Sequence, residues 1–189
     1  HCAAKLRVAL KDQLLLFTFR TKTEGGKVAL AHEEYLHFIR TVLATDCADL
    51  IDIEFFTAGA ELPALIEEAH TAGAAVVCSS HNFHKTPPRA ELVSRMVAMQ
   101  RAGADLPKLA VMPQSRADVL ELLAATAEMA DRHPETPIIT MSMGALGAVS
   151  RLSGEALGSA MTFANPGQAS APGQVSLDVV NEVLDALHL

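Results

Sequence analysis

Short apolar segments alternate along this chain with longer stretches that have the period of an amphipathic helix. In the stretch 89–103, for example, Leu92, Val93, Met96 and Val97 fall on one face. Strands that alternate with helices predict right-handed crossovers and a parallel sheet, either open and doubly wound or closed as a barrel. Near-continuous apolar strands fit this prediction, because a parallel sheet is covered on both faces. Six segments have the character of such strands: 13–19, 50–56, 74–80, 108–113, 137–143 and 159–164.

The spacing of these segments favours a barrel. The units average roughly 30 residues, and a complete eight-unit barrel takes about 250. Six units in 189 residues therefore predict an α/β fold of the (β/α)8 TIM-barrel type. We expect an N-terminally incomplete version of this barrel, with about six βα units in a single domain over 1–189. The chain begins with His1, and two apolar edge segments would be left uncovered. We therefore expect roughly 60 further residues upstream, or strands lent by a neighbouring subunit.

Polar residues occur where the predicted strands end, and in a barrel the loops after the strands gather at one face. A single pocket is therefore expected. An open doubly wound sheet would usually have a glycine-rich first turn, and no glycine-rich nucleotide-binding motif is present. Asp52 and Glu54 share a face of the second strand, so they need cationic partners or water. Met141 and Met143 also share a face, and they either belong to the core or form a wall of the pocket. The remaining candidates are Arg20 and Glu24 after the first strand, His81 after the third, Lys108 on the fourth, and the loop 169–174 after the sixth.

Lys108 indicates the chemistry most directly. It alternates with Ala110 and Met112 in an otherwise apolar strand. Its side chain therefore either extends to the strand edge or is buried for a functional role. Burial disfavours the ammonium form and leaves some neutral amine, which attacks ketones and aldehydes. The protonated imine that forms acidifies the adjacent C–H group, so one further base is sufficient to remove a proton.

His81 is the expected base, because the ordinary pKa of histidine lies near neutrality. Glu24 could orient its imidazole, as a carboxylate does in a hydrolase triad. His84 and Lys85 are interpreted as solvated loop residues. The pair His81 and His84 lacks the helical spacing and third ligand of a zinc motif, so we expect no metal.

Composition narrows the class of partner. The net charge is −7 and no basic run is present, which argues against a nucleic-acid partner. The cysteines are three in number and lack metal-type spacing, which favours a reduced, cytoplasmic protein. The sequence contains neither an apolar run of the roughly 20 residues that span a bilayer nor a visible signal peptide. We therefore expect neither a nucleic-acid nor a membrane partner.

Six stretches in this order resemble type I 3-dehydroquinate dehydratases, which act at the third step of the shikimate pathway towards the aromatic amino acids. The resemblance runs nearly end to end. It implies a (β/α)8 barrel, a lyase that converts 3-dehydroquinate to 3-dehydroshikimate and water through a Schiff base, a homodimer, and no metal or cofactor. The stretches are "LLFTFRTKTEGG" (15–26), "SSHNFHKTP" (79–87), "LPKLAVMPQS" (106–115), "PIITMSMG" (137–144), "VSRLSGEALGSAMTF" (149–163) and "ASAPGQ" (169–174).

The resemblance also implies roles for individual residues. Lys108 would capture the substrate ketone, His81 would be the general base and later protonate the departing hydroxyl, and Glu24 would pair with His81. Arg151 would bind the substrate carboxylate, which suits a planar bidentate donor. The further substrate-binding residues would be Arg20, Met141, Met143, and Ser170 and Gln174 of a loop that closes over the site.

Two departures from the family pattern stand out. Asn82 follows the histidine where the family commonly has aspartate, and a Glu-x-Arg stretch of the family's second strand has no counterpart in 1–12. Two alternatives stay open at this point. One is another class I Schiff-base barrel enzyme such as an aldolase, for which Arg151 and the 169–174 loop would be unexpected. The other is a non-catalytic, degenerate regulatory protein, which would usually have lost Lys108, His81 or Glu24.

Overall fold

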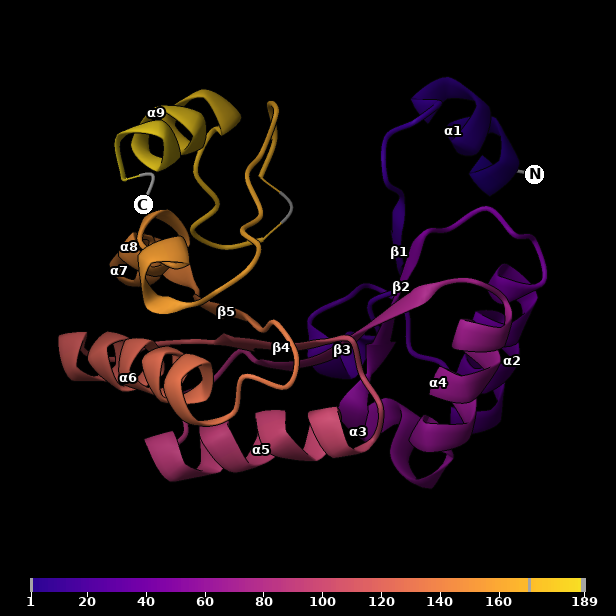
Figure 1. Ribbon diagram of the computed structural model, residues 1–189, viewed down its shortest axis with the longest axis horizontal. Helices are drawn as coiled ribbons and strands as arrows, with labels where there is room; N and C mark the ends of the chain where they lie inside the picture. Colours follow the sequence, from indigo (N-terminus) through magenta and orange to yellow (C-terminus); the bar gives the residue numbers. More distant parts are fainter. Residues whose placement is uncertain (1, 170, 188–189) are drawn as a thin grey trace. The chain divides into compact units, whose positions relative to one another are not determined.

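The computed structural model describes residues 2–169 and 171–187, and it contains a parallel sheet with the strand order β1-β2-β3-β4-β5 (Figure 1). Helices or short helical turns connect successive strands, as the alternation of apolar segments predicts. The strands are β1 Leu16–Thr18, β2 Leu50–Glu54, β3 Ala75–Asn82, β4 Leu106–Val111 and β5 Ile139–Ser142.

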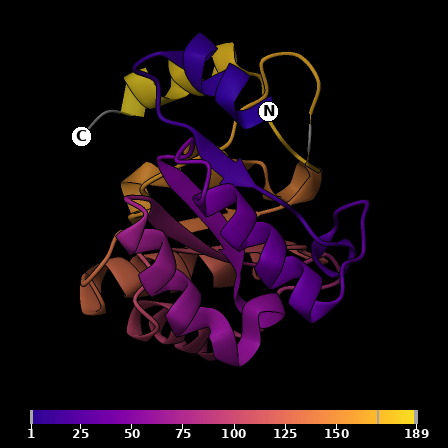
Figure 2. The ribbon, with the colours of Figure 1, turned by 90° about the vertical axis from the view of Figure 1, so that its right-hand side faces the viewer.

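Residues 2–80 and 99–106 form one compact unit. In it, β1 pairs with β2, and β2 pairs with β3 with Asp52 opposite Val77. Helices α2 (His32–Leu43) and α4 (Leu62–Thr71) lie side by side (Figure 2). They have apolar faces at helical spacing, and the buried residues of α2 are Tyr35, Leu36, Ile39 and Val42.

Residues 81–98, 107–169 and 171–187 belong to the second unit. In it, β4 pairs with β5 with Lys108 opposite Ile139. Helix α6 (Arg116–Arg132) begins at the N-cap Ser115, whose hydroxyl accepts a hydrogen bond from the Asp118 backbone N–H. A buried hydrogen bond of 2.6 Å between the Thr126 and Thr140 hydroxyls joins α6 to β5.

The segment 159–164 differs from its prediction, because it is not a strand. It makes a single parallel bridge between Ile138 and Ser159, with the Ala160 N–H donating to the Ile138 carbonyl at 2.8 Å. An apolar segment becomes a strand only where a neighbouring segment continues the ladder of backbone hydrogen bonds. The described backbone pairing of 159–164 with the segment before β5 consists of this one bridge. The expected single barrel domain over 1–189 stays a prediction.

The other elements include the helix predicted from the apolar face of 89–103, which is confirmed as α5 (Arg89–Arg101). The described part of the chain contains no helix that is long and apolar enough to cross a membrane. The remaining helices are α1 Cys2–Leu10, α3 Phe55–Ala58, α7 Gly144–Gly147, α8 Val149–Leu152 and α9 Leu177–Leu187, and the 3-10 turns are η1 Lys22–Glu24, η2 Gly59–Glu61 and η3 Glu155–Leu157.

Candidate active site

Glu24 lies on a tight turn that glycine makes possible. After β1 the chain forms η1, and Gly25 ends it with φ of 93°, in the left-handed region that favours glycine. A Cβ on Gly26 would lie 1.8 Å from the Arg20 carbonyl oxygen, so only glycine fits there. The Gly26 N–H donates to the Thr21 carbonyl at 2.8 Å and closes the turn. Glu24 is thereby buried, with 5% of its surface exposed.

Arg20 is held by carboxylates of its own unit. Its guanidinium donates to Asp52 at 2.7 Å, to Glu54 at 3.0 Å and to Glu24 at 3.4 Å. The Ser79 hydroxyl, which accepts from Arg20 at 2.9 Å, donates to Asp52 in turn. Burial alone would lower the pKa of Arg20, but the charges of Asp52, Glu54 and Glu24 raise it above its usual value. The expectation that Asp52 and Glu54 need a cationic partner is therefore confirmed.

Glu54 anchors this turn to β2. Its Oε1 accepts from Arg20 and from the Thr21 N–H at 2.8 Å, and its Oε2 accepts from the hydroxyls of Thr21 and Thr57, each at 2.6 Å. The Glu54 N–H donates to the Tyr35 hydroxyl at 2.8 Å. Burial raises the pKa of Tyr35 well above its ordinary value. A carboxylate with four described donors is well satisfied in the interior.

Cys78, which precedes the candidate base on β3, is buried in the first unit. Burial, reinforced by the negative charges of Asp52 and Glu24, raises the pKa of its thiol. A thiol whose ionisation is suppressed in this way is a poor nucleophile, so Cys78 is not a candidate catalytic group.

Lys108 belongs to the second unit and lies on β4, opposite Ile139 of β5. Only 6% of its surface is exposed, so of the two alternatives left open by the sequence the structure shows the buried one. Its ammonium nitrogen Nζ lies 4.5 Å from the centroid of the Phe163 ring, within the range of a cation–π contact.

His81 also belongs to the second unit and lies near the end of β3. Its ring stacks on that of Phe83, with the centroids 6.4 Å apart. Asn82 organises the turn that follows, because its side-chain oxygen accepts from the N–H groups of His84 and Lys85 at 2.9 and 3.0 Å. The amide therefore takes over the turn-forming work of an aspartate at this position, without its charge.

Arg151, on α8, is 2% exposed and has no carboxylate partner among residues 2–169 and 171–187. It donates to the Pro172 carbonyl at 3.2 Å and lies 3.4 Å from the sulfur of Met141. Its Nε has no hydrogen-bond partner in the described chain. Burial lowers the pKa of this guanidinium. A buried guanidinium without a counter-charge is suited to binding an anion.

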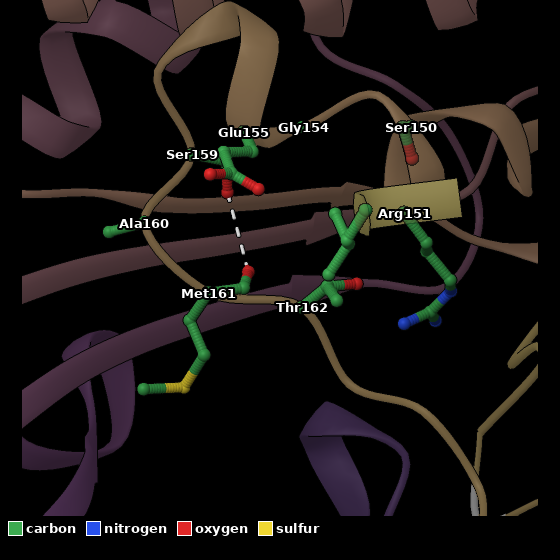
Figure 3. A pocket seen from close by; sticks show the side chains of 9 residues that line it. Ser150, Arg151, Gly154, Glu155, Ser159, Ala160, Met161 and Thr162 are labelled. Carbon is green, nitrogen blue, oxygen red and sulfur yellow. Dashed lines mark hydrogen bonds between the residues drawn. The ribbon is translucent and has the colours of Figure 1, made fainter. Parts of the chain in front are cut away.

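Arg151 lines a cavity of about 360 Å³ in the second unit (Figure 3). Within its wall, the Ser159 hydroxyl donates to the Met161 carbonyl at 3.4 Å, as the dashed line shows. The cavity is lined by Ser150, Arg151, Gly154, Glu155, Ser159, Ala160, Met161, Thr162 and Leu184.

The loop that contains Gln174 lies against the turn after β5. The Gly144 N–H donates to the Pro172 carbonyl at 3.2 Å, and a Cβ on Gly173 would lie 2.3 Å from the Gly144 carbonyl oxygen. The Gln174 side chain accepts from the Ala171 N–H at 3.3 Å. Ser170, the other predicted residue of this loop, lies outside the described residues.

The predicted site residues thus fall into two groups. Arg20 and Glu24 belong to the first unit, and Lys108, His81, Met141, Met143, Arg151 and Gln174 belong to the second. Met141 and Met143 are 5% and 1% exposed, and the contact with Arg151 places the Met141 sulfur beside a candidate binding group. No cluster of three or more metal-binding side chains occurs in the described ranges.

Sequence reasoning gave no role to three residues that hold the candidate groups. Phe163 contacts Lys108, Ser79 bridges Arg20 and Asp52, and Thr57 donates to Glu54. Phe163 carried a signal, since it is one of only 7 phenylalanines and closes a motif shared with the resembled family. Ser79 carried a weaker signal, because it opens the stretch 79–87 shared with the same family but is a common residue type, and Thr57 carried none.

Comparisons with known proteins agree across the whole chain. A family model described as type I 3-dehydroquinase matches residues 1–189. The 3-dehydroquinate dehydratase of Klebsiella pneumoniae subsp. pneumoniae is 51% identical over 184 residues, which cover 97% of this chain and 73% of the relative.

Two solved structures agree with the sequence matches. The type I 3-dehydroquinate dehydratase of Clostridium difficile, with covalently modified comenic acid, is 45% identical with a TM-score of 0.94, covering 98% of this chain and 73% of the other. The 3-dehydroquinate dehydratase of Geobacillus kaustophilus is 40% identical with a TM-score of 0.93, covering 98% and 72%. The expected resemblance and the expected barrel fold class are confirmed, and the matches favour a dehydratase over the aldolase and regulatory alternatives.

Proposed function

We propose that this chain, which belongs to the type I 3-dehydroquinase family, is a lyase. Its reaction would convert 3-dehydroquinate to 3-dehydroshikimate and water. One observation carries the chemistry. Lys108 is a 6% exposed amine on a strand that is otherwise apolar. An amine held at a fixed place in an enclosed, largely apolar strand is suited to attack a ketone and form an imine.

The reaction would then proceed through an imine and an enamine. The Lys108 amine adds to the substrate ketone to give a neutral carbinolamine. The carbinolamine hydroxyl takes up a proton from solvent and leaves as water, and the nitrogen lone pair forms the protonated imine. His81 takes a proton from the carbon next to the imine, and the electron pair of that C–H bond forms an enamine. The enamine expels the hydroxyl group from the next carbon as His81 returns the proton, so that water leaves. Hydrolysis of the conjugated imine releases the product and restores the amine.

Arg151 would bind the substrate carboxylate in this scheme. Its guanidinium is buried and lacks a carboxylate partner in the described chain, so an incoming carboxylate would supply its counter-charge. Met141 would form an apolar wall beside it, and Gln174 would contact the substrate from the loop that touches Arg151 through Pro172. The roles expected for Arg20, Glu24, Met143 and Ser170 stay predictions.

Borohydride trapping tests this function. We expect reduction in the presence of 3-dehydroquinate to leave a covalent mass on Lys108, located by peptide mass spectrometry. Lys108→Ala should take up no label and lose nearly all turnover, measured by the ultraviolet absorbance of the conjugated product. Lys85→Ala is the matched control, because Lys85 is an exposed loop lysine. Label on Lys85 in the unchanged protein would overturn the assignment.

His81→Ala separates the two steps. The variant should still form an imine but stall before proton transfer, because removal of a general base commonly costs about 10² to 10⁴ in rate. A trapped adduct on Lys108 should therefore accumulate while turnover falls. His84→Ala, which changes a neighbouring exposed histidine, should retain normal turnover. If His81→Ala retained it too, another residue would be the base.

Two further properties concern the assembly of the protein and its surroundings. We propose that the protein acts as a homodimer in the cytoplasm, with no nucleic acid or membrane among its partners. The family resemblance supports the dimer, and the odd number of cysteines and net charge of −7 support the rest. Light scattering during gel filtration would measure the mass in solution, and a single-chain mass at micromolar concentration would contradict the dimer.

A further inference from the structure

The aromatic ring against the candidate nucleophile is a feature that the proposed chemistry has not used. The Nζ atom of Lys108 lies 4.5 Å from the centroid of the Phe163 ring. Lys108 is buried, and Phe163 is itself partly shielded from solvent. A cation over an aromatic face is attracted by the negative face of the ring quadrupole, and this attraction is stronger in a desolvated site than at an exposed one.

The protein backbone holds the ring in this place. Phe163 lies in the segment 159–164, which bridges to Ile138 through Ser159, and the Ala160 N–H of this segment donates to the Ile138 carbonyl at 2.8 Å. The Thr140 N–H donates to the Ser159 hydroxyl at 3.0 Å, which ties the same segment to β5. Since β5 pairs directly with β4, the strand that carries Lys108, the ring and the nitrogen are positioned through one hydrogen-bonded framework.

We propose that Phe163 is a catalytic group whose ring face stabilises the positive charge on the Lys108 nitrogen in the protonated imine. This inference deepens the proposed function and rests on it. In the step concerned, the neutral carbinolamine hydroxyl takes up a proton from solvent and leaves as water. The nitrogen lone pair then forms the C=N bond, and the nitrogen becomes cationic. The ring therefore favours the iminium over the carbinolamine before it.

A purely steric role makes a different prediction. A ring that only fills space would contribute equally to neutral and cationic nitrogen, and any isosteric replacement would serve as well. A ring that acts through its quadrupole loses its effect gradually as fluorine substitution withdraws electron density from the face. Fluorination changes the shape of the side chain little, so a graded series separates the two roles.

The experiment places 4-fluoro-, 3,5-difluoro- and 3,4,5-trifluorophenylalanine at position 163 by stop-codon suppression in the full chain. Each protein is held in steady state with saturating 3-dehydroquinate and quenched with borohydride, which reduces the iminium but not the carbinolamine. Intact mass gives the ratio of labelled to unlabelled protein. We expect this ratio to fall stepwise with fluorine number, by about 3- to 30-fold across the series, from the usual size of a desolvated cation–π contact.

The controls keep the outcome clear. The same amino acids at Phe56, a 60% exposed residue of α3, should leave the ratio unchanged. Phe163→Tyr retains the aromatic face and should retain most of the labelling, whereas Phe163→Leu should resemble the trifluoro protein. An unchanged ratio along the series at position 163, with Lys108 still labelled, would overturn the role of Phe163 alone. Absence of label on Lys108 in the unchanged protein would overturn the proposed function as well.

Discussion

Arg20 and Arg151 are both largely shielded from solvent, but their chemical surroundings are opposite. Arg20 donates to three carboxylates of its own unit, and their charges raise its pKa. Arg151 has a carbonyl and a sulfur as its neighbours, an Nε without a partner in the described chain, and a pKa lowered by burial. The first guanidinium has its counter-charges in the fold, and the second has none among the described residues.

This difference indicates what each arginine contributes. A charge that is paired inside the protein contributes to the stability of the folded chain, because removal of one partner leaves the others buried and uncompensated. A buried charge without a partner costs stability, and the cost is recovered when an anion binds. The two arginines should therefore respond to the same substitution with opposite changes in stability.

Arg151→Met should have the largest effect, on catalysis. Loss of a buried, hydrogen-bonded charge pair with the substrate carboxylate costs about 2 to 5 kcal/mol. We expect kcat/KM for 3-dehydroquinate to fall about 30- to 5,000-fold in steady-state assays. The free energy of unfolding in urea should rise by about 1 to 2 kcal/mol, because a desolvated charge is removed.

Arg132→Met is the control for this variant, since the Arg132 side chain is 73% exposed. It should change the free energy of unfolding by less than about 0.5 kcal/mol and leave kcat/KM unaltered. A clear loss of stability in Arg151→Met would show that this guanidinium has a compensating partner, and the contrast with Arg20 would then fail.

Arg20→Met should have the second-largest effect, on stability. It removes the described cation from beside Asp52 and Glu54, which are both fully buried, and should lower the free energy of unfolding by about 3 to 5 kcal/mol. Urea denaturation measures the loss. Arg40→Met is the matched control, because the bidentate pair of Arg40 with Glu68 is about 40% exposed and should contribute less than about 1 kcal/mol. Equal losses would contradict the comparison.

Glu54→Gln sharpens the comparison at smaller scale. The amide keeps one acceptor oxygen but turns an N–H₂ donor toward groups that donate to the carboxylate. We expect a loss of about 1 to 3 kcal/mol in the free energy of unfolding, measured in urea. Glu68→Gln, at an exposed pair, should cost no more than about 1 kcal/mol. If the two glutamine variants were equally stable, the four hydrogen bonds to Glu54 would not be important for the turn.

Tyr35→Phe should have the smallest effect at neutral pH, about 0.5 to 1.5 kcal/mol, because it removes one hydrogen bond to the Glu54 N–H. Burial raises the pKa of Tyr35, so its neutral form stabilises the folded state relative to the unfolded one. That stability is complete below the unfolded pKa of about 10 and is lost as the pH rises further.

This pH dependence can be measured without interference, because Tyr35 is the only tyrosine of the chain. Absorbance at 295 nm should show phenol ionisation only as the protein unfolds in alkali. Tyr35→Phe should lose stability less steeply above pH 10 than the unchanged protein. Ionisation of Tyr35 near pH 10 in the folded protein would contradict the buried position of its hydroxyl.

Much of the fold was accessible from the pattern of residues. The alternation of apolar segments and amphipathic stretches predicted strands β1 to β5 and helix α5, because strand and helix periods are local properties of the backbone. Local reasoning also singled out Lys108, since its neighbours on the same face are apolar, but only the structure showed that it is buried rather than extended to the strand edge. The shared face of Asp52 and Glu54 required a cation for the same reason.

Local pattern did not show where each segment and each charge would find a partner. The segment 159–164 has the composition of a strand but makes only one bridge, because a strand also needs a neighbour that continues the ladder. Arg20 and Arg151 looked alike as substrate-binding candidates. The position of Arg20 beside Ser79, 59 residues away in the chain, separated them.

The sequence by itself determined the order of the elements, the type of most of them and the family, together with the residues able to form an imine. The tertiary structure alone decided which charges are compensated inside the fold and which aromatic ring meets Lys108. The reason is physical. Periodicity depends on residues within one or two turns of each other, whereas the surroundings of Arg20, Arg151 and Lys108 are made by segments that are distant in sequence, which only the folded chain brings together.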